Sequence, residues 1–219
     1  MRSGRFQSRT VVAGLVVAWL APVSGQNPPR PGAESLRYRM LVAEDARAVA
    51  PADLAPLFEG LADPDARIVQ VAVRALGRLE RPEFVPQLRR ALADADSDVR
   101  TEAANALGQV ATGQADEVQR VLLERVSIER DSGVLEAMFD TLGRLPYTSA
   151  DGRRAVEPVL VQALGADASA VKVRLGAAGG LEALIRGARG TNFVASAPTL
   201  TVLRRQVVAN NRPGGSEDE

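Results

Sequence analysis

The side chains with the clearest chemical potential are carboxylates that gather in two short segments. Asp63 and Asp65 stand in the first segment, and Asp94, Asp96 and Asp98 stand in the second. Grouped carboxylates serve acid–base catalysis in a cleft or bind calcium in a loop. The same side chains also accept hydrogen bonds from backbone N–H groups at the start of a helix. Because each segment precedes a helix-forming stretch, we interpret them as helix caps, with a loose calcium site as the alternative.

The 219-residue chain contains neither histidine nor cysteine. This composition excludes the ordinary zinc ligands, the serine–histidine and cysteine–histidine nucleophile pairs, and histidine as a proton carrier. We therefore expect a protein that is not an enzyme and that needs no metal and no cofactor. The 27 basic residues balance 27 acidic ones, and the arginines form no basic stripe. No nucleic-acid partner is expected.

A repeated block indicates which elements would position a site. The run DPDARIVQVAVRALGRL begins at Asp63, and the run DADSDVRTEAANALGQV begins at Asp94, an offset of 31 residues. A third copy contains Asp131 and Gly143, and a fourth contains Val173. Apolar residues recur at helical spacing on both sides of each turn. Repeats of this length predict an all-α solenoid of antiparallel helix pairs, with four to five repeats.

The repeats resemble those of the HEAT-repeat family. The run DSDVRTEAANALG at 96–108 has the family's pattern: an Asp-rich turn, Val-Arg, and then Ala-Ala-x-Ala-Leu-Gly. The resemblance implies a fold of helix pairs and an arginine–aspartate ladder that links neighbouring repeats, and it says little about function because the fold serves many roles. Val69 and Leu135 take the place of the arginine in the first and third copies. We therefore expect the ladder to be interrupted.

Local patterns set the expected boundaries of the elements. Ser35 is the candidate N-cap of a first helix, and Phe58 belongs to the apolar face of the helix that follows. Residues 147–153 are expected to form the loop between the third and fourth pairs. Gly179 and Gly180 each lower helix propensity by about 1 kcal/mol, so the helix that contains them is expected to be the weakest.

The first 25 residues have the features of a secretory signal peptide. Arg2, Arg5 and Arg9 precede an apolar run at 11–20, and small residues stand before Gln26. A bilayer span takes about 20 apolar residues, so we expect cleavage, with an uncleaved anchor as the alternative. The mature protein would be periplasmic or secreted and, after cleavage, not bound to a membrane. Removing the leader takes away three arginines and no acid, which leaves a net charge of −3.

These patterns divide the chain into four segments. The expected segments are a signal peptide at 1–25, a flexible lead-in at 26–34, a HEAT-like α-solenoid at 35–210 and a disordered acidic tail at 211–219.

Polar positions on the second helix of each pair line up across the repeats. They are spaced by four residues, which places each set on one face of its helix. The candidate partner-binding residues are Gln70, Arg74 and Arg78 in the first repeat, Thr101, Asn105 and Gln109 in the second, and Glu136, Asp140 and Arg144 in the third. Such a row of side chains suits a protein partner or an extended peptide. A merely solvated face is the alternative.

Two functions fit this organisation. We expect a non-catalytic module for protein–protein interaction or scaffolding. The alternative comes from a second resemblance, because an exported leader followed by LVAEDAR at 41–47 and HEAT repeats is similar to the N-terminal part of some bacterial peptidyl-prolyl isomerases. Their cyclophilin domain has no counterpart here, so the chain would be the solenoid portion of a secreted isomerase or chaperone. HEAT-like bilin lyases work inside the cell, and the leader argues against that function.

Overall fold

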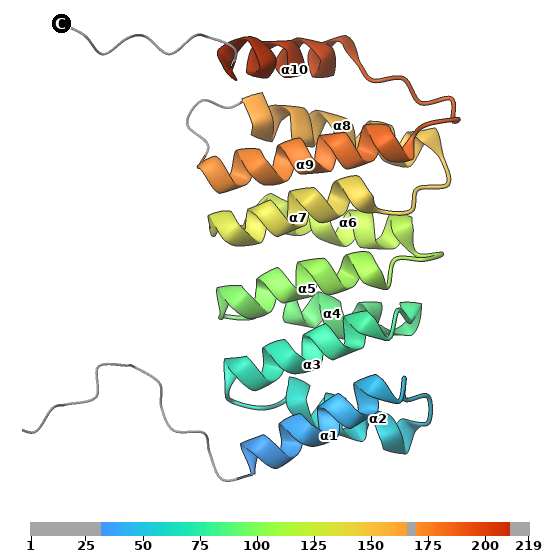
Figure 1. Ribbon diagram of the computed structural model, residues 1–219, viewed down its shortest axis with the longest axis vertical. Helices are drawn as coiled ribbons and strands as arrows, with labels where there is room; N and C mark the ends of the chain where they lie inside the picture. Colours follow the sequence, from blue (N-terminus) through green and yellow to red (C-terminus); the bar gives the residue numbers. More distant parts are fainter. Residues whose placement is uncertain (1–31, 166–169, 211–219) are drawn as a thin grey trace, which may run out of the picture.

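The computed structural model describes residues 32–165 and 170–210, where every regular element is a helix (Figure 1). The elements are α1 (Ala33–Asp45), α2 (Pro51–Leu61), α3 (Ala66–Arg78), the short 3-10 helix η1 (Pro82–Phe84), α4 (Val85–Ala91), α5 (Ser97–Gln109), α6 (Ala115–Val126), α7 (Ser132–Arg144), α8 (Ala150–Gly165), α9 (Val171–Gly187) and α10 (Ala197–Asn210). The predicted all-α class is confirmed. The predicted signal peptide, the tail at 211–219 and most of the lead-in lie outside the described residues.

The helices form two layers (Figure 1). An odd layer contains α1, α3, α5, α7 and α9, which stack side by side, and the even-numbered helices α2, α4, α6 and α8 lie behind it. Each of these even helices packs against the odd helix that follows it in the chain, whereas α10 packs against α8. Within the described residues, four complete helix pairs therefore lie between one unpaired helix at each end, which confirms the predicted solenoid.

Aspartates start three of the odd helices, as the sequence predicts. Asp65, Asp96 and Asp131 are the N-caps of α3, α5 and α7, and their carboxylates accept hydrogen bonds from backbone N–H groups one turn ahead. Asp63 accepts a hydrogen bond from the backbone N–H of the cap Asp65, and Asp94 accepts one from the backbone N–H of the cap Asp96, each at 2.8 Å. The grouped carboxylates thus organise turns. The start of the first helix differs from expectation: α1 begins at Ala33 after Gly32, and Ser35 lies in its first turn.

Glycines allow neighbouring odd helices to approach closely. A methyl group added at Gly77 of α3 would lie 2.8 Å from Cβ of Ala106 on α5. The closest approach joins α7 to α9, where a methyl group at Gly143 would overlap the backbone of Gly180. Gly180, which sequence patterning marks only as a weak point, is therefore a packing position. Interiors packed at crystal-like density leave no room for extra atoms at such contacts.

A buried carboxylate, Glu129, links the second pair to the third. It lies between α6 and α7 with 4% of its surface exposed. Arg100 of α5 donates to its two oxygens at 2.9 and 3.1 Å, and Arg125 of α6 donates at 2.8 Å. Burial raises the pKa of Glu129. The hydrogen bonds from Arg100, Asp131 N–H, Arg125 and Arg130 N–H outweigh burial and lower the pKa to about 2. Arg100 thus links the repeats through the Glu129 carboxylate, and within its own repeat it donates to the backbone carbonyl oxygens of Asp94 and Ala95, each at 2.9 Å.

The connection between the third and fourth pairs is shorter than predicted. Because α8 begins at Ala150, Arg153 belongs to the helix and not to the loop. Its buried guanidinium donates to the carbonyl oxygens of Tyr147 at 2.8 Å and Ser149 at 3.1 Å. A further hydrogen bond, to Gly187 O at 3.2 Å, ties α8 to the end of α9. A buried arginine satisfied by three carbonyls holds this connection in one conformation.

Candidate functional site

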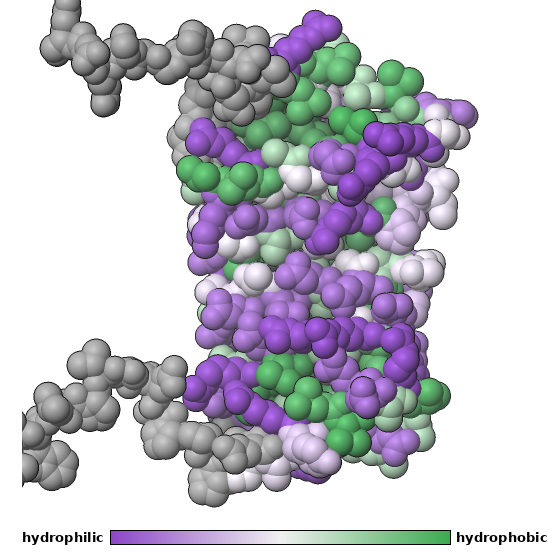
Figure 2. Space-filling model, viewed as in Figure 1, coloured by the Kyte–Doolittle hydropathy of each residue, from purple (hydrophilic) through white to green (hydrophobic). Residues whose placement is uncertain are grey.

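The predicted partner-binding residues lie on the odd layer, on the side that faces away from the even helices. We call this surface the odd-helix face. Figure 2 looks onto it: hydrophilic residues cover α3, α5 and α7, whereas hydrophobic residues are exposed over α1. None of the nine candidate residues is buried. The face is therefore accessible along the whole predicted row.

The three residues of α3 form one end of this row. Arg74 pairs with Glu102 of α5 at 3.1 Å, and Arg78 pairs with Glu44 of α1 at 2.6 Å. Exposed ion pairs of this kind contribute less than about 1 kcal/mol each to stability, so a competing partner charge displaces them at low cost. Gln70 is half-buried and lines neither of the hollows described next.

A first hollow, the α5–α7 hollow, has a volume of about 340 Å³. It is lined by Glu102, Asn105, Gly108, Gln109, Thr141 and Arg144. Three of these residues, Asn105, Gln109 and Arg144, belong to the predicted row. Thr141 is 1% exposed, and its Oγ1 has no hydrogen-bond partner. Amide and hydroxyl groups that both donate and accept therefore line this hollow.

A second hollow, the α7–α9 hollow, has a volume of about 370 Å³. It is lined by Thr101, Gly133, Glu136, Ala137, Asp140, Leu175 and Gly176. Thr101, Glu136 and Asp140 come from the predicted row. Leu175 of α9 is 58% exposed and supplies an apolar surface beside the two carboxylates. The combination of exposed aliphatic carbon with carboxylate oxygens suits an amphipathic side chain.

One ion pair separates the two hollows. Asp140, which lines the α7–α9 hollow, accepts from Arg144, which lines the α5–α7 hollow, at 2.6 Å. The structure thus brings six of the nine predicted residues into two adjacent hollows.

Seven lining residues lie outside the predicted row, and three of them, Leu175, Thr141 and Glu102, have side chains larger than a methyl group that can contact a ligand. Leu175 occupies the position in the fourth repeat that Thr101 and Glu136 occupy in the second and third. Extending the alignment of the predicted row to the fourth repeat would include Leu175, whereas a selection of polar residues alone leaves it out. Thr141 aligns with the buried Ala106 and has the pattern of a packing position. Glu102 is adjacent to Thr101 and carries no signal of its own.

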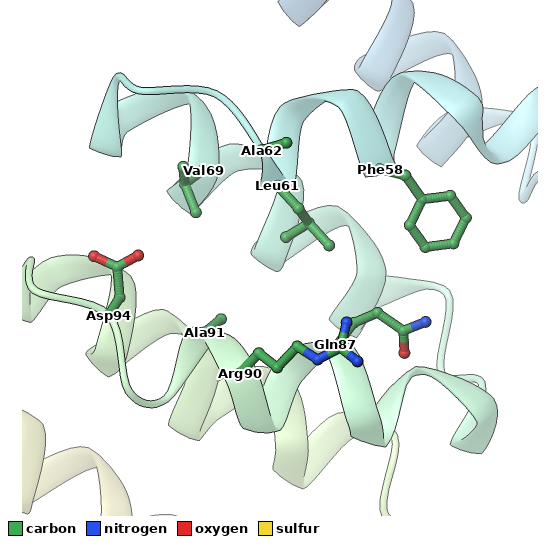
Figure 3. Close-up of a pocket in the computed structure, with 8 residues that line it drawn as sticks. All are labelled: Phe58, Leu61, Ala62, Val69, Gln87, Arg90, Ala91 and Asp94. Atoms are coloured by element: carbon green, nitrogen blue, oxygen red, sulfur yellow. The ribbon is translucent and has the colours of Figure 1, made fainter.

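A separate groove opens at α2 and α4 (Figure 3). Its volume is about 460 Å³, and Leu61, Ala62, Val69 and Ala91 supply apolar surface, with Gln87, Arg90 and Asp94 as the polar lining. Phe58 also lines it. Sequence patterning places Phe58 in the core, yet the side chain is 36% exposed and contacts Phe84 edge-on, with ring centroids 6.3 Å apart. The α2 side chains that point into the core are instead those of Leu54 and Leu57, which are buried.

In residues 32–165 and 170–210, no three acidic side chains lie close enough together to hold a metal ion. In the same ranges, no helix has the length and apolar composition needed to cross a bilayer.

Comparison with known proteins identifies the repeats. The chain is similar to an engineered protein of known crystal structure, with 19% identity and a TM-score of 0.47 over 80% of this chain and 88% of that one. It is also similar to the complex of CpcE and CpcF of phycocyanin lyase from Nostoc sp. PCC7120, with 17% identity and a TM-score of 0.37 over 86% and 98%. Curated proteins gave no match. Residues 54–143, from α2 into α7, match the family model of HEAT repeats, so the fold is an all-α, HEAT-like solenoid.

Proposed function

We propose that the protein is a non-catalytic interaction module, exported as a periplasmic or secreted protein, that binds an extended segment of a protein partner across the odd-helix face. The observation that carries this proposal is the pair of adjacent hollows, to which six residues at repeat-related positions contribute. The leader at 1–25 supports export.

The spacing of the hollows suits an extended chain. Packed helices lie about 8–10 Å apart. The two hollows are also offset along α7, since Glu136 and Asp140 line one of them and Arg144 lines the other. A polyproline-type extended segment rises about 3.1 Å per residue with three residues per turn. Side chains three residues apart therefore lie on one side, about 9 Å from each other. A segment that crosses the odd helices would place such a pair of side chains in the two hollows.

The groups in the hollows suit binding. Asn105 and Gln109 each offer an N–H donor and a carbonyl acceptor, which match the N–H and C=O groups of an extended main chain. Such a segment has no internal hydrogen bonds, so its polar groups are available to the solenoid. The hollows also lack a histidine or cysteine that would serve as base or nucleophile.

Affinity capture from a cell-envelope extract tests the proposal. The immobilised protein is compared with an odd-face variant, Asn105→Ala with Asp140→Ala and Arg144→Ala, and with an even-layer control, Gln87→Ala with Arg89→Ala and Arg90→Ala. Circular dichroism confirms that all three are folded. We expect a partner that the wild type and the control retain and the odd-face variant loses. A partner retained by the odd-face variant, or lost only by the control, would refute the proposal.

A further inference from the structure

Glu136 is a carboxylate of the odd-helix face that no arginine or lysine of the described residues pairs with. It is half-buried in the α7–α9 hollow and, in the described part of the chain, makes no hydrogen bond or ion pair. Two neighbouring carboxylates are paired, Glu102 with Arg74 and Asp140 with Arg144. A carboxylate with no partner of its own offers both oxygens to an arriving cation.

The surface beside Glu136 suits an aliphatic chain. Leu175 is 58% exposed, and Ala137 and Gly176 complete the apolar part of the hollow. Gly176 lies against the backbone of α7, since a methyl group there would fall 2.6 Å from Cα of Glu136. This contact brings the apolar surface of α9 close to the carboxylate. Arginine and lysine have the matching structure, with an aliphatic stem that ends in a cation.

The basic groups nearby leave Glu136 available. Arg144 is engaged by Asp140 at 2.6 Å. Lys172 of α9 is exposed, its Nζ lies 3.8 Å from the position of a Cβ on Gly133, and it makes no ion pair with Glu136. A cation from a partner therefore meets no basic side chain already bound to Glu136.

Thr141 offers an unpaired hydroxyl in the adjacent hollow. Its side chain is 1% exposed and lines the α5–α7 hollow, yet Oγ1 has no partner. Buried polar groups in folded proteins are almost always hydrogen-bonded, so this hydroxyl is available to a polar group that enters the hollow.

We infer that the α7–α9 hollow binds an arginine or lysine side chain of an extended protein segment, with the cation at Glu136 and the aliphatic stem on Leu175, while a residue three positions away occupies the α5–α7 hollow. This inference rests on the proposed function, because it specifies the partner chemistry of the same face.

Selection from a random linear dodecapeptide display library tests this inference. The targets are the wild type, Glu136→Gln, and the control Glu117→Gln, which removes the same charge from the exposed Glu117–Arg120 pair on α6. We expect the wild type and the control to enrich peptides with arginine or lysine at one position and a preferred residue three positions away. Glu136→Gln should lose the preference for the cation.

Fluorescence anisotropy then measures the affinity of the protein for the best arginine peptide and for its citrulline analogue, in which the side chain has nearly the same shape but no charge. Citrulline should weaken binding to the wild type about tenfold, or 1.4 kcal/mol, and leave binding to Glu136→Gln nearly unchanged. Equal losses on both proteins would overturn the assignment of the cation to Glu136. Peptides enriched without any cation would overturn the inference and leave the proposed function intact. No enrichment on any target would overturn both.

Discussion

Replacing Gly180 by alanine tests the packing of α7 against α9. The added methyl group would overlap the carbonyl oxygen of Phe139 and lie 3.1 Å from Cδ2 of Leu160. The overlapped oxygen belongs to the backbone of α7, so the helices have to separate to admit the methyl group. Gly187, in the same helix, has no atom within 4 Å of an added methyl group and serves as the matched control.

The two substitutions should change stability in opposite directions. Alanine favours a helix over glycine by about 1 kcal/mol, whereas overpacking costs about 1–3 kcal/mol and more when backbone has to move. We expect a net loss of about 2 kcal/mol for Gly180→Ala and a gain of about 0.5–1 kcal/mol for Gly187→Ala. For a chain of this size, about 2–4 °C of Tm corresponds to 1 kcal/mol. Gly180→Ala should therefore lower Tm by about 4–8 °C, and Gly187→Ala should raise it by about 1–4 °C.

Thermal unfolding followed by circular dichroism at 222 nm measures both proteins beside the wild type. A Gly180→Ala protein as stable as the wild type, or stabilised like Gly187→Ala, would refute the close contact between α7 and α9. It would also restore the interpretation that Gly180 merely weakens its helix.

Three further predictions follow from the contacts described above. Glu129, with its pKa lowered from 4.5 to about 2, should stabilise the fold by about 3 kcal/mol above pH 5 and lose that contribution as the pH falls toward 2. Urea unfolding of Glu129→Gln should not show this dependence of stability on pH. The same dependence in the wild type and in Glu129→Gln would contradict the prediction. Asp96→Ala should cost about 1 kcal/mol through loss of the α5 cap, whereas Asp98→Ala, on an exposed side chain, should cost less; equal losses in urea unfolding would argue against the cap. Expression of the full chain in a bacterial host with an export pathway should give a protein that begins at Gln26, and N-terminal sequencing that finds the leader intact would contradict cleavage.

The elements were predictable where local chemistry decides the outcome. An N-cap depends on one side chain and the N–H groups of the next turn, so Asp65, Asp96 and Asp131 could be assigned from sequence alone. The register of the repeats follows from the spacing of small and apolar residues, which places Gly77 and Gly108 at equivalent positions. Helix pairing follows from that register.

Features that depend on neighbouring repeats were harder to predict. The direction of Phe58 depends on how α2 lies against η1, and the role of Gly180 depends on how closely α9 approaches α7. The partner of Arg100 is Glu129, which no fixed spacing in the repeat identifies. In the candidate site, Leu175 was missed because the prediction considered only polar residues, and Leu175 is an apolar residue at a position equivalent to theirs.

The central claim is that an extended partner segment binds across the two hollows, and hydrogen–deuterium exchange tests it most directly. Exchange of the protein alone is compared with exchange in the presence of the captured partner or the best selected peptide. We predict slower exchange in α5, α7 and α9, and unchanged exchange in α2 and α4. Slower exchange confined to α2 and α4, beside the groove of Figure 3, would contradict the claim.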